Sequence, residues 1–350
     1  MASGKAGRVY TRREGDFRLD FHEKLLAIAR PVSFPLGARL VRQGEASRGA
    51  FVIRRGEVEA QVALPGGGML AVAQLGEGDM FGEMALIERG VCSASVLARA
   101  AVEAWFIERD DFRAMVASRD PAALELQRKI TRVLAAKLRA LNAKVRGHPA
   151  AEDRPAGEVP KVSELEQKPP AFAWRGFLPV LPFFEGFDDY EIDELAARCR
   201  AFEAARGTWL FAPGGAAGAC FIVVRGAVEI FSFSKEHQRR VALAGPGEIV
   251  GYLALLEGGR HAAAARVRET ACLLEFPAKA FLALYEGDSG ASVSLQHAIH
   301  KSLLRSLART NTQLTRLISH AHLTAAARDA AELEKALHGQ IVQSSSLTET

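Results

Sequence analysis

Cysteine is scarce in this sequence, and its four copies are widely spaced. They are Cys92, Cys199, Cys220 and Cys272, and no two of them form a C-x-x-C pair. This spacing excludes a zinc ribbon and gives no reason to expect a disulfide framework, so a reducing cytoplasm is the expected compartment. The first twenty residues have arginines but no apolar core behind them, so we expect no secretory signal.

Long apolar runs and catalytic motifs are also missing. No run approaches the roughly 18 apolar residues that span a bilayer, so we expect no membrane insertion. The sequence has no G-x-S-x-G, no Walker loop and no paired catalytic carboxylates. Its nine histidines show no metal-ligand spacing joined to acidic partners. We therefore expect neither an enzyme nor a metal site.

Strong charge of one sign is absent as well. The 45 Lys and Arg residues against 41 Asp and Glu residues give a formal net charge of only +4. A nucleic-acid binder usually concentrates its positive charge in a stripe. Here the densest group, between Arg128 and Arg146, is interspersed with Leu and Ala, as on a solvated helix face. We therefore expect no nucleic-acid partner.

What the sequence does contain is an internal repeat. The segment Ala50–Glu59 aligns with Cys220–Glu229 at an offset of 170 residues, and Gly82–Glu88 aligns with Gly251–Glu257 at an offset of 169. One deletion in a hairpin explains the change of offset. The 350 residues suit two domains of about 100–200 residues each. The chain is therefore predicted to be two copies of one domain.

Composition along the chain gives the predicted boundaries. We expect a flexible N-terminus over 1–19, a first domain over 20–147 and a proline-bearing linker over 148–173. A second domain with a long C-terminal helix follows over 174–320, and a helical extension with a disordered tail over 321–350.

Within each copy the hydrophobic period is mostly two. Val58, Ala60, Val62 and Leu64 alternate with polar residues before a Pro-Gly-Gly-Gly turn, which is typical of a half-buried hairpin. Several short strands separated by glycine turns favour a jelly-roll barrel. The predicted fold class is mainly β with flanking α: two tandem jelly-roll β-barrel domains, each with a C-terminal helix. The pair Asp188 and Glu191 predicts a capping box at the start of a helix in the second copy.

The segment Phe81–Val96 contains the strongest functional signal. Gly82 enters a short helical turn whose free N–H groups can hold a phosphate, and Glu83 can accept a hydrogen bond from a sugar hydroxyl. With Gly44-Glu45, Gly56 and the 75–79 turn, the segment resembles the phosphate-binding cassette of the cyclic nucleotide-binding domain family. That family includes catabolite activator protein and the regulatory subunits of cyclic-AMP-dependent protein kinase. The resemblance covers residues 20–145 and 175–320, and it implies the same fold in both.

The resemblance also implies roles for individual residues. In the family the cassette reads F-G-E-L-A-L, a short loop, then R-x-A-T/S-V, where Gly and Glu bind phosphate and ribose and Arg binds the phosphate charge. In the first copy Gly82, Glu83, Ala85 and Ser95 match, and Met84 replaces the leucine. The arginine position holds Cys92, followed by Ser93, and the nearest arginine is Arg89.

The second cassette departs in the opposite way. Gly251, Leu253 and Ala254 match, but Tyr252 stands at the glutamate position. The arginine position holds His261, with Arg260 beside it. A lost charge-assisted hydrogen bond costs about 1.5–3 kcal/mol, or roughly 10- to 100-fold in affinity. We therefore expect no cofactor and no tight binding of a cyclic nucleotide, and the first cassette is then a fold-forming turn.

These observations leave two functional hypotheses. The first is a non-catalytic regulatory or scaffolding protein with degenerate domains that acts through contacts with unidentified protein partners. The alternative is a sensor of a cyclic nucleotide or dinucleotide that signals through helix repacking. A transcription factor is disfavoured because residues 323–339 form a single Ala- and Glu-rich helical stretch with no recognition helix. The excess of Arg over Lys and the abundance of Ala are typical of a bacterial protein.

A stripe on the last helix predicts an interface. Its members recur at the a and d spacings of a coiled coil: Leu304, Leu307, Asn311, Leu314 and Ile318. An Asn at an a position favours a two-stranded partner, because each amide can pair with its twin. We therefore expect homodimerisation through this helix. The alternative is that the stripe packs back on its own barrel.

Overall fold

A computed structural model of the chain describes residues 28–345 with short gaps at 64–67, 88–89, 148–152, 156–157, 161, 163–167 and 235–236. Leu70 and the residues from Ile318 onward are described by their backbone only. The chain divides into two compact units, Met1–Thr131 with Leu284–Lys301, and Arg132–Ala283 with Ser302–Thr350. These units follow contacts rather than the sequence repeat, so the predicted domain boundaries stay predictions.

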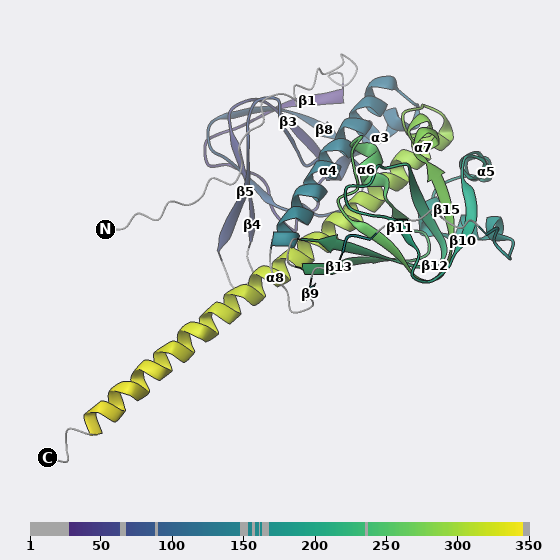
Figure 1. Cartoon of the computed structure of the whole chain (residues 1–350). Helices are drawn as coiled ribbons and strands as arrows, with labels where there is room; N and C mark the ends of the chain where they lie inside the picture. Colours follow the sequence, from purple (N-terminus) through teal and green to yellow (C-terminus); the bar gives the residue numbers. More distant parts are fainter. Residues whose placement is uncertain are drawn as a thin grey trace. The chain divides into compact units, whose positions relative to one another are not determined.

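The first copy is built from two four-stranded antiparallel sheets (Figure 1). One has the order β1-β8-β3-β6 and the other β2-β7-β4-β5. Its elements are β1 (Ala29–Phe34), β2 (Arg39–Val41), β3 (Gly49–Arg55), β4 (Val58–Ala63), β5 (Met69–Leu75), β6 (Met80–Phe81), α2 (Met84–Ile87), β7 (Ser95–Ala98), β8 (Val102–Glu108), α3 (Arg109–Ala117) and α4 (Pro121–Gly147). The inward side chains of both sheets form one core, which includes Phe51, Ile53, Val58, Phe81, Val96 and Val102.

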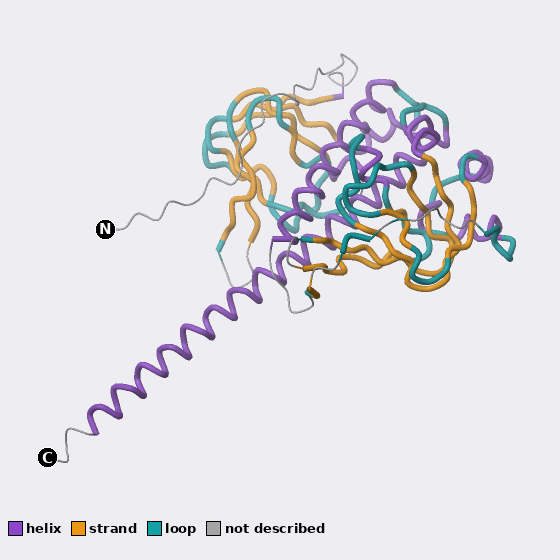
Figure 2. Tube along the Cα trace, in the orientation of Figure 1, coloured by secondary structure: helices purple, strands orange, loops and turns teal. Residues whose placement is uncertain are grey.

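The second copy repeats this order after a helical entry (Figure 2). The entry comprises η1 (Trp174–Val180), η2 (Pro182–Phe184) and α5 (Asp189–Ala197). The strands and helices that follow are β10 (Arg200–Ala204), β11 (Trp209–Phe211), β12 (Ala219–Phe233), β13 (His237–Ala244), β14 (Ile249–Val250), α6 (Tyr252–Leu256), β15 (Ala264–Pro277), α7 (Ala278–Tyr285) and α8 (Gly290–Ser345). Asp188 and Glu191 form the predicted capping box at the start of α5. That prediction is confirmed.

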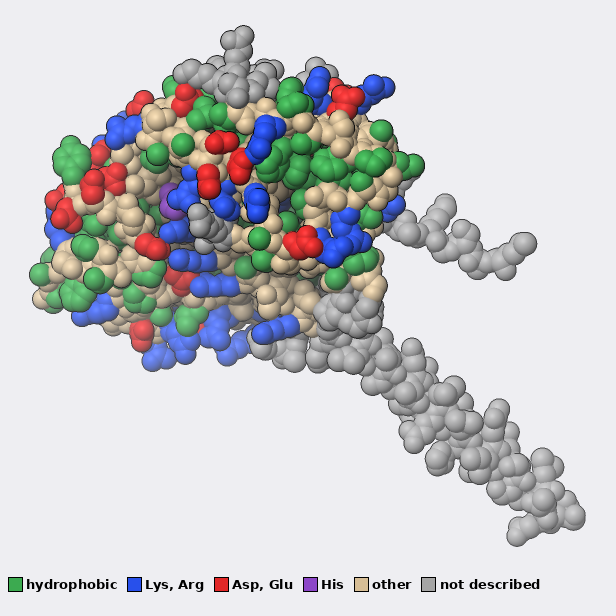
Figure 3. All heavy atoms as spheres, turned by 180° about the vertical axis from the view of Figure 1, so that it is seen from behind, with side chains coloured by type: hydrophobic (Ala, Val, Ile, Leu, Met, Phe, Trp, Pro, Cys, Tyr) green, Lys and Arg blue, Asp and Glu red, His purple; other side chains and the backbone are tan. Residues whose placement is uncertain are grey.

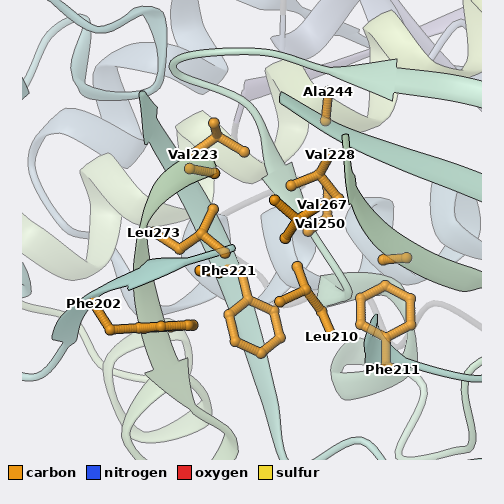
Figure 4. Close-up of a cluster of buried hydrophobic side chains, with 13 residues drawn as sticks. Phe202, Leu210, Phe211, Phe221, Val223, Val228, Ala244, Val250, Val267 and Leu273 are labelled. Carbon is orange, nitrogen blue, oxygen red and sulfur yellow. The ribbon is translucent and has the colours of Figure 1, made fainter. Parts of the chain in front are cut away.

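Long strands join the two layers of the second copy into one sheet. Strand β12 spans the positions of both β3 and β4, and β15 spans those of β7 and β8, so the sheet order becomes β10-β15-β12-β13-β9. The enclosed core includes Phe202, Leu210, Phe211, Phe221, Val223, Val228, Val267 and Leu273 (Figure 4). The predicted fold class, mainly β with flanking helices in two jelly-roll-type domains, is confirmed, although the described strands pair into open sheets.

One glycine explains how β12 passes between the layers. Gly226 has a φ of +88°, and a Cβ there would lie 2.7 Å from the Cα of Ala271 on β15. Gly56, its counterpart in the first copy, has a φ of +99° and a Cβ there would lie 2.2 Å from the carbonyl oxygen of Ala101. Only glycine tolerates both the left-handed backbone and this close approach. The glycine matched by the repeat therefore serves the fold in both copies.

The described parts of the predicted linker are held against the second copy. Strand β9 (Arg154–Pro155) pairs with β13. Beside it, the Asp153 carboxylate accepts a 2.8 Å hydrogen bond from Nη2 of Arg239, whose side chain is only 3% exposed. The same guanidinium donates to the Val145 carbonyl at 3.2 Å. This segment therefore contributes a buried ion pair to the second unit as well as connecting the copies.

The surface agrees with the small net charge. On the face shown in Figure 3, acidic, basic and hydrophobic side chains are interspersed, and basic ones gather toward its lower part. None of the helices that the structure describes is long and apolar enough to cross a membrane.

Candidate functional site

The first cassette is positioned by the edge of the β3 sheet. Phe81 pairs with Phe51 across β6 and β3, and their rings stack with centroids 4.9 Å apart. The next residue, Gly82, has a φ of +75°, and a Cβ there would lie 2.8 Å from the Gly49 carbonyl oxygen. Helix α2 then buries three side chains, Ala85, Leu86 and Ile87. The turn predicted from the sequence is therefore present, and it contributes to the core.

The far end of this cassette is fixed by hydrogen bonds to the loop after β2. The Cys92 N–H donates to the Glu45 carbonyl at 2.8 Å, and the Gly44 N–H donates to the Cys92 carbonyl at 2.9 Å. Ser95 is buried, and its hydroxyl oxygen accepts a 3.0 Å hydrogen bond from the Gln43 N–H. Ser93 is exposed. The structure thus brings the Gly44-Glu45 pair and the cassette together, as the resemblance implies.

A cavity of about 200 Å³ lies beside Cys92. Its apolar wall includes Val41, Phe51 and Phe106, and its polar wall includes Arg42, Glu45 and Arg48. Arg42 forms an ion pair with Glu45 at 3.5 Å. Glu83, by contrast, is 5% exposed and is not among the residues described as lining this cavity. The predicted acid and the residue at the arginine position therefore do not line the same cavity.

Arg42 and Arg48 are site residues that the sequence analysis did not single out. Both flank the Gly44-Glu45 pair, which the resemblance had already drawn into the site. Their closeness in sequence to this pair is the signal that could have identified them as residues lining the cavity. Arg89, named as the nearest arginine to the cassette position, lies outside the described residues.

The second cassette replaces the acid with a buried aromatic residue. Gly251, with a φ of +86°, caps α6, and Tyr252 begins it. Tyr252 is 4% exposed. Burial raises the pKa of its hydroxyl, a hydrogen bond with Ser306 lowers it in part, and the nearby Glu248 carboxylate raises it further. Tyr252 is therefore a neutral, enclosed side chain where the family places an acceptor. Ala254 is buried and Leu253 half-buried in the same short helix.

His261 occupies the place in the second copy that Cys92 occupies in the first. The His261 N–H donates to the Gly215 carbonyl at 3.0 Å, and the Gly214 N–H donates to the His261 carbonyl at 2.8 Å. These are the repeat equivalents of the Cys92 hydrogen bonds. The structure therefore agrees with the alignment of the two cassettes at this position.

The His261 side chain is enclosed by an aromatic stack. Its ring lies parallel to that of Phe211, with centroids 4.0 Å apart and an interplanar angle of 11°. Burial lowers the pKa of His261 to about 4, so the ring is neutral at pH 7. The equivalent positions in the first copy, Val41 and Cys92, line the cavity instead. In the second copy, the rings of Phe211 and His261 thus occupy the region that corresponds to the cavity of the first copy.

Arg260 does not supply the missing cation at the His261 position. Its guanidinium Nη1 donates a 2.7 Å hydrogen bond to the Gly214 carbonyl, and the residue is exposed. No group of three or more His, Cys, Asp or Glu side chains able to hold a metal ion occurs in the part of the chain that the structure describes.

The predicted interface stripe lies mostly inside the chain. Leu304, Leu307 and Leu314 are each less than a tenth exposed, whereas Asn311 is exposed. The side chain of Ile318 lies outside the described residues. Homodimerisation through this stripe stays a prediction.

Comparisons with known proteins agree with this architecture. The family model described as "Cyclic nucleotide-binding domain" matches residues 31–119 and 201–288, which together make up just over half of the chain. Each match falls within one of the two copies that the repeat predicted.

The curated relatives match over a stretch of about the length of one copy. The CRP-like cAMP-activated global transcriptional regulator of Mycobacterium tuberculosis is 31% identical over 112 residues, which are 32% of this chain and 48% of that protein. The cyclic AMP receptor protein of Thermus thermophilus is 29% identical over 103 residues, 29% of this chain and 44% of that protein. This chain spans about half the length of the curated relatives it matches.

Among solved structures, the regulatory domain of Toxoplasma gondii PKA with cAMP is 18% identical, with a TM-score of 0.31, covering 78% of this chain and 85% of that one. Each of the two family matches includes one of the repeated cassettes, and these matches establish the family. The chain belongs to the cyclic nucleotide-binding domain family and contains two copies of its domain.

Proposed function

We propose that this protein is a non-catalytic regulatory or scaffolding protein that acts through contacts with protein partners, and that neither of its domains binds cyclic AMP or cyclic GMP tightly. The observation that carries the proposal is the pair of residues at the cassette arginine position. One is Cys92, a thiol, and the other is His261, a neutral ring stacked on Phe211. Neither gives the bidentate, permanently charged contact that a cyclic phosphate needs in a pocket.

A second observation supports the same proposal for the second domain. Tyr252 replaces the sugar acceptor, and its side chain is buried. A nucleotide would have to displace both this side chain and the His261–Phe211 stack from the core. The second domain is therefore proposed to be a structural and protein-binding module. The four cysteines are free, which supports a reducing cytoplasm as the compartment.

The test is calorimetric titration of the full-length protein with cyclic AMP, before and after Cys92→Arg. The wild type is expected to show no site at low-micromolar or tighter affinity. Restoring the guanidinium should add a charge-assisted contact of about 1.5–3 kcal/mol, or roughly 10- to 100-fold in affinity. Ser93→Arg is the matched control, because it adds the same charge at the adjacent exposed position. A low-micromolar site in the wild type would overturn the proposal.

One observation favours a ligand-sensing alternative for the first domain. The cavity of about 200 Å³ beside Cys92 is lined by Arg42 and Arg48, two cations from the Gly44-Glu45 loop. These could hold an anionic group in place of the cassette arginine. A thermal-shift panel of cyclic mononucleotides and dinucleotides tests this, since a ligand at 100 times its Kd stabilises the native state by about 2.7 kcal/mol. A ligand whose stabilising effect is lost in Arg42→Ala/Arg48→Ala would favour the sensor.

A further inference from the structure

Helices α4 and α8 contact each other at positions that the internal repeat makes equivalent. Within the first unit, Gln127 Nε2 donates to Gln296 Oε1 at 2.9 Å, and Thr131 Oγ1 bonds to His300 Nε2; both pairs are separated by 169 residues. Within the second unit, Thr310 Oγ1 donates to Asn142 Oδ1 at 3.3 Å across 168 residues. In each unit the two helices are thus joined at positions about 169 residues apart.

The polar residues at this contact are buried. Gln127 is 6% exposed, and Thr131, Gln296 and His300 are each 0% exposed. Thr131 Oγ1 already donates to the Gln127 carbonyl at 3.0 Å, so it can only accept from His300 Nε2–H. Gln296 also donates to the Tyr285 carbonyl at 2.7 Å. Buried polar pairs of this kind stabilise one register, because any shift would leave the groups without partners.

Apolar residues at equivalent positions of the two helices are buried as well. Leu134 and Leu303, Leu138 and Leu307, and Val145 and Leu314 are related by the same offset, and all six are buried. The leucines at 307 and 314 belong to the stripe that predicted a homodimer. In the single chain these two leucines are already buried.

One equivalent pair differs in size. Thr131 on α4 corresponds to His300 on α8, and the two side chains are bonded to each other and buried. In a pair of two α8 helices, imidazole would face imidazole, which overpacks this layer. In a pair of two α4 helices, the two threonines would face each other and leave a cavity.

We propose that the α8 stripe is a heterospecific interface whose partner is α4 of the same chain, and that the small–large pair Thr131–His300 selects this pairing over α8–α8 pairing between chains. The protein is then a monomer. The partner of this surface is the chain's own first copy.

A residue swap in the full-length protein tests the complementarity. Thr131→His places two imidazoles in the layer, and His300→Thr leaves two small residues, so each single variant is expected to lower the Tm. The double swap restores one small and one large side chain, and its Tm should recover most of the loss. A double swap whose Tm loss equals the sum of the single losses would overturn the proposal.

The matched control joins His300→Thr to Thr312→His. Thr312 is an exposed residue on the same helix, so a histidine there cannot refill the layer. No recovery of Tm is expected, and recovery equal to that of the Thr131→His swap would count against the proposal.

Light scattering on the wild type gives a second, independent test that requires no variant to fold. The expected mass at tens of micromolar is that of one chain, 37.8 kDa. A mass of twice that value would overturn the proposal and favour the homodimer predicted from the sequence.

Discussion

Mild acid should destabilise this protein through two buried histidines. Burial lowers the pKa of His300 to about 3 and that of His261 to about 4, against an ordinary value of 6.5. The neighbouring His297 lowers the His300 pKa further. Because both folded-state values lie below the unfolded value, the unfolded chain binds protons first as the pH falls. The stability from each neutral ring is fully present above about pH 6.5 and is lost progressively toward the folded pKa.

The size of the effect follows from the shifts. One pKa unit corresponds to about 1.36 kcal/mol, so at pH 5 each histidine should have lost about 2 kcal/mol of stabilisation. Together this is about 4 kcal/mol, a large share of the 5–15 kcal/mol typical of a folded domain. Glu59 and Glu229, whose pKa values are lowered by arginine partners, act in the same direction only below their ordinary value of 4.5. Glu257, whose pKa burial raises, acts in the opposite direction.

Urea unfolding at pH 7, 6 and 5, at constant ionic strength, measures this effect. The wild-type free energy of unfolding should fall with a slope that approaches two protons per molecule. His300→Gln and His261→Gln should each reduce this slope by about one proton per molecule. In the double variant the free energy of unfolding should depend little on pH between pH 7 and 5. The slope is the readout, because both substitutions also change packing. If His300→Gln kept the wild-type slope, the reasoning about this buried ring would be refuted.

Three further predictions concern the fold. Asp153→Ala leaves the buried Arg239 guanidinium without its carboxylate and should lower the free energy of unfolding in urea by about 3–5 kcal/mol. The double variant Asp153→Leu/Arg239→Met removes both charges and should lose less stability. An equal loss in the two variants would mean that the unpaired charge is not the cause. Gly226→Ala should cost more than about 1 kcal/mol because of its positive φ and the close Ala271 Cα. Gly245→Ala, with nothing within 4 Å, should change stability by less than about 0.5 kcal/mol by the same assay. Limited proteolysis should cut first within 148–173 and leave two resistant fragments, whereas early cutting inside either set of sheets would contradict the predicted boundaries.

The sequence alone was sufficient for the family, the duplication and the fold class. These depend on local signals that repeat: glycines at tight turns such as Gly56 and Gly226, period-two strands, and the Gly82 and Gly251 turns that open the cassettes. A left-handed φ or a close backbone approach admits almost no other residue, so glycine spacing records the fold directly. The Asp188–Glu191 capping box was predictable for the same reason, since its two hydrogen bonds lie within one helical turn.

The state of each cassette could be predicted only in part. Alignment gave the residues that replace the family's acid and arginine, and the backbone hydrogen bonds of Cys92 and His261 agree with that alignment. It could not give the His261–Phe211 stack, because the two residues are 50 positions apart and meet only when the strands assemble. Arg42 and Arg48 were missed as lining residues because exposed arginines in a loop have no periodic signal.

The partner of the last helix was decided by tertiary structure alone. A heptad stripe such as Leu304, Leu307 and Leu314 specifies that a helix has an apolar face, but any apolar face of matching shape can cover it. The choice depends on which buried polar groups find partners, and here those of Gln127 and Thr131 meet Gln296 and His300 from 169 residues away. Hydrogen-bond geometry of that kind is set by the folded arrangement of two distant helices, and the sequence of either helix by itself does not contain it.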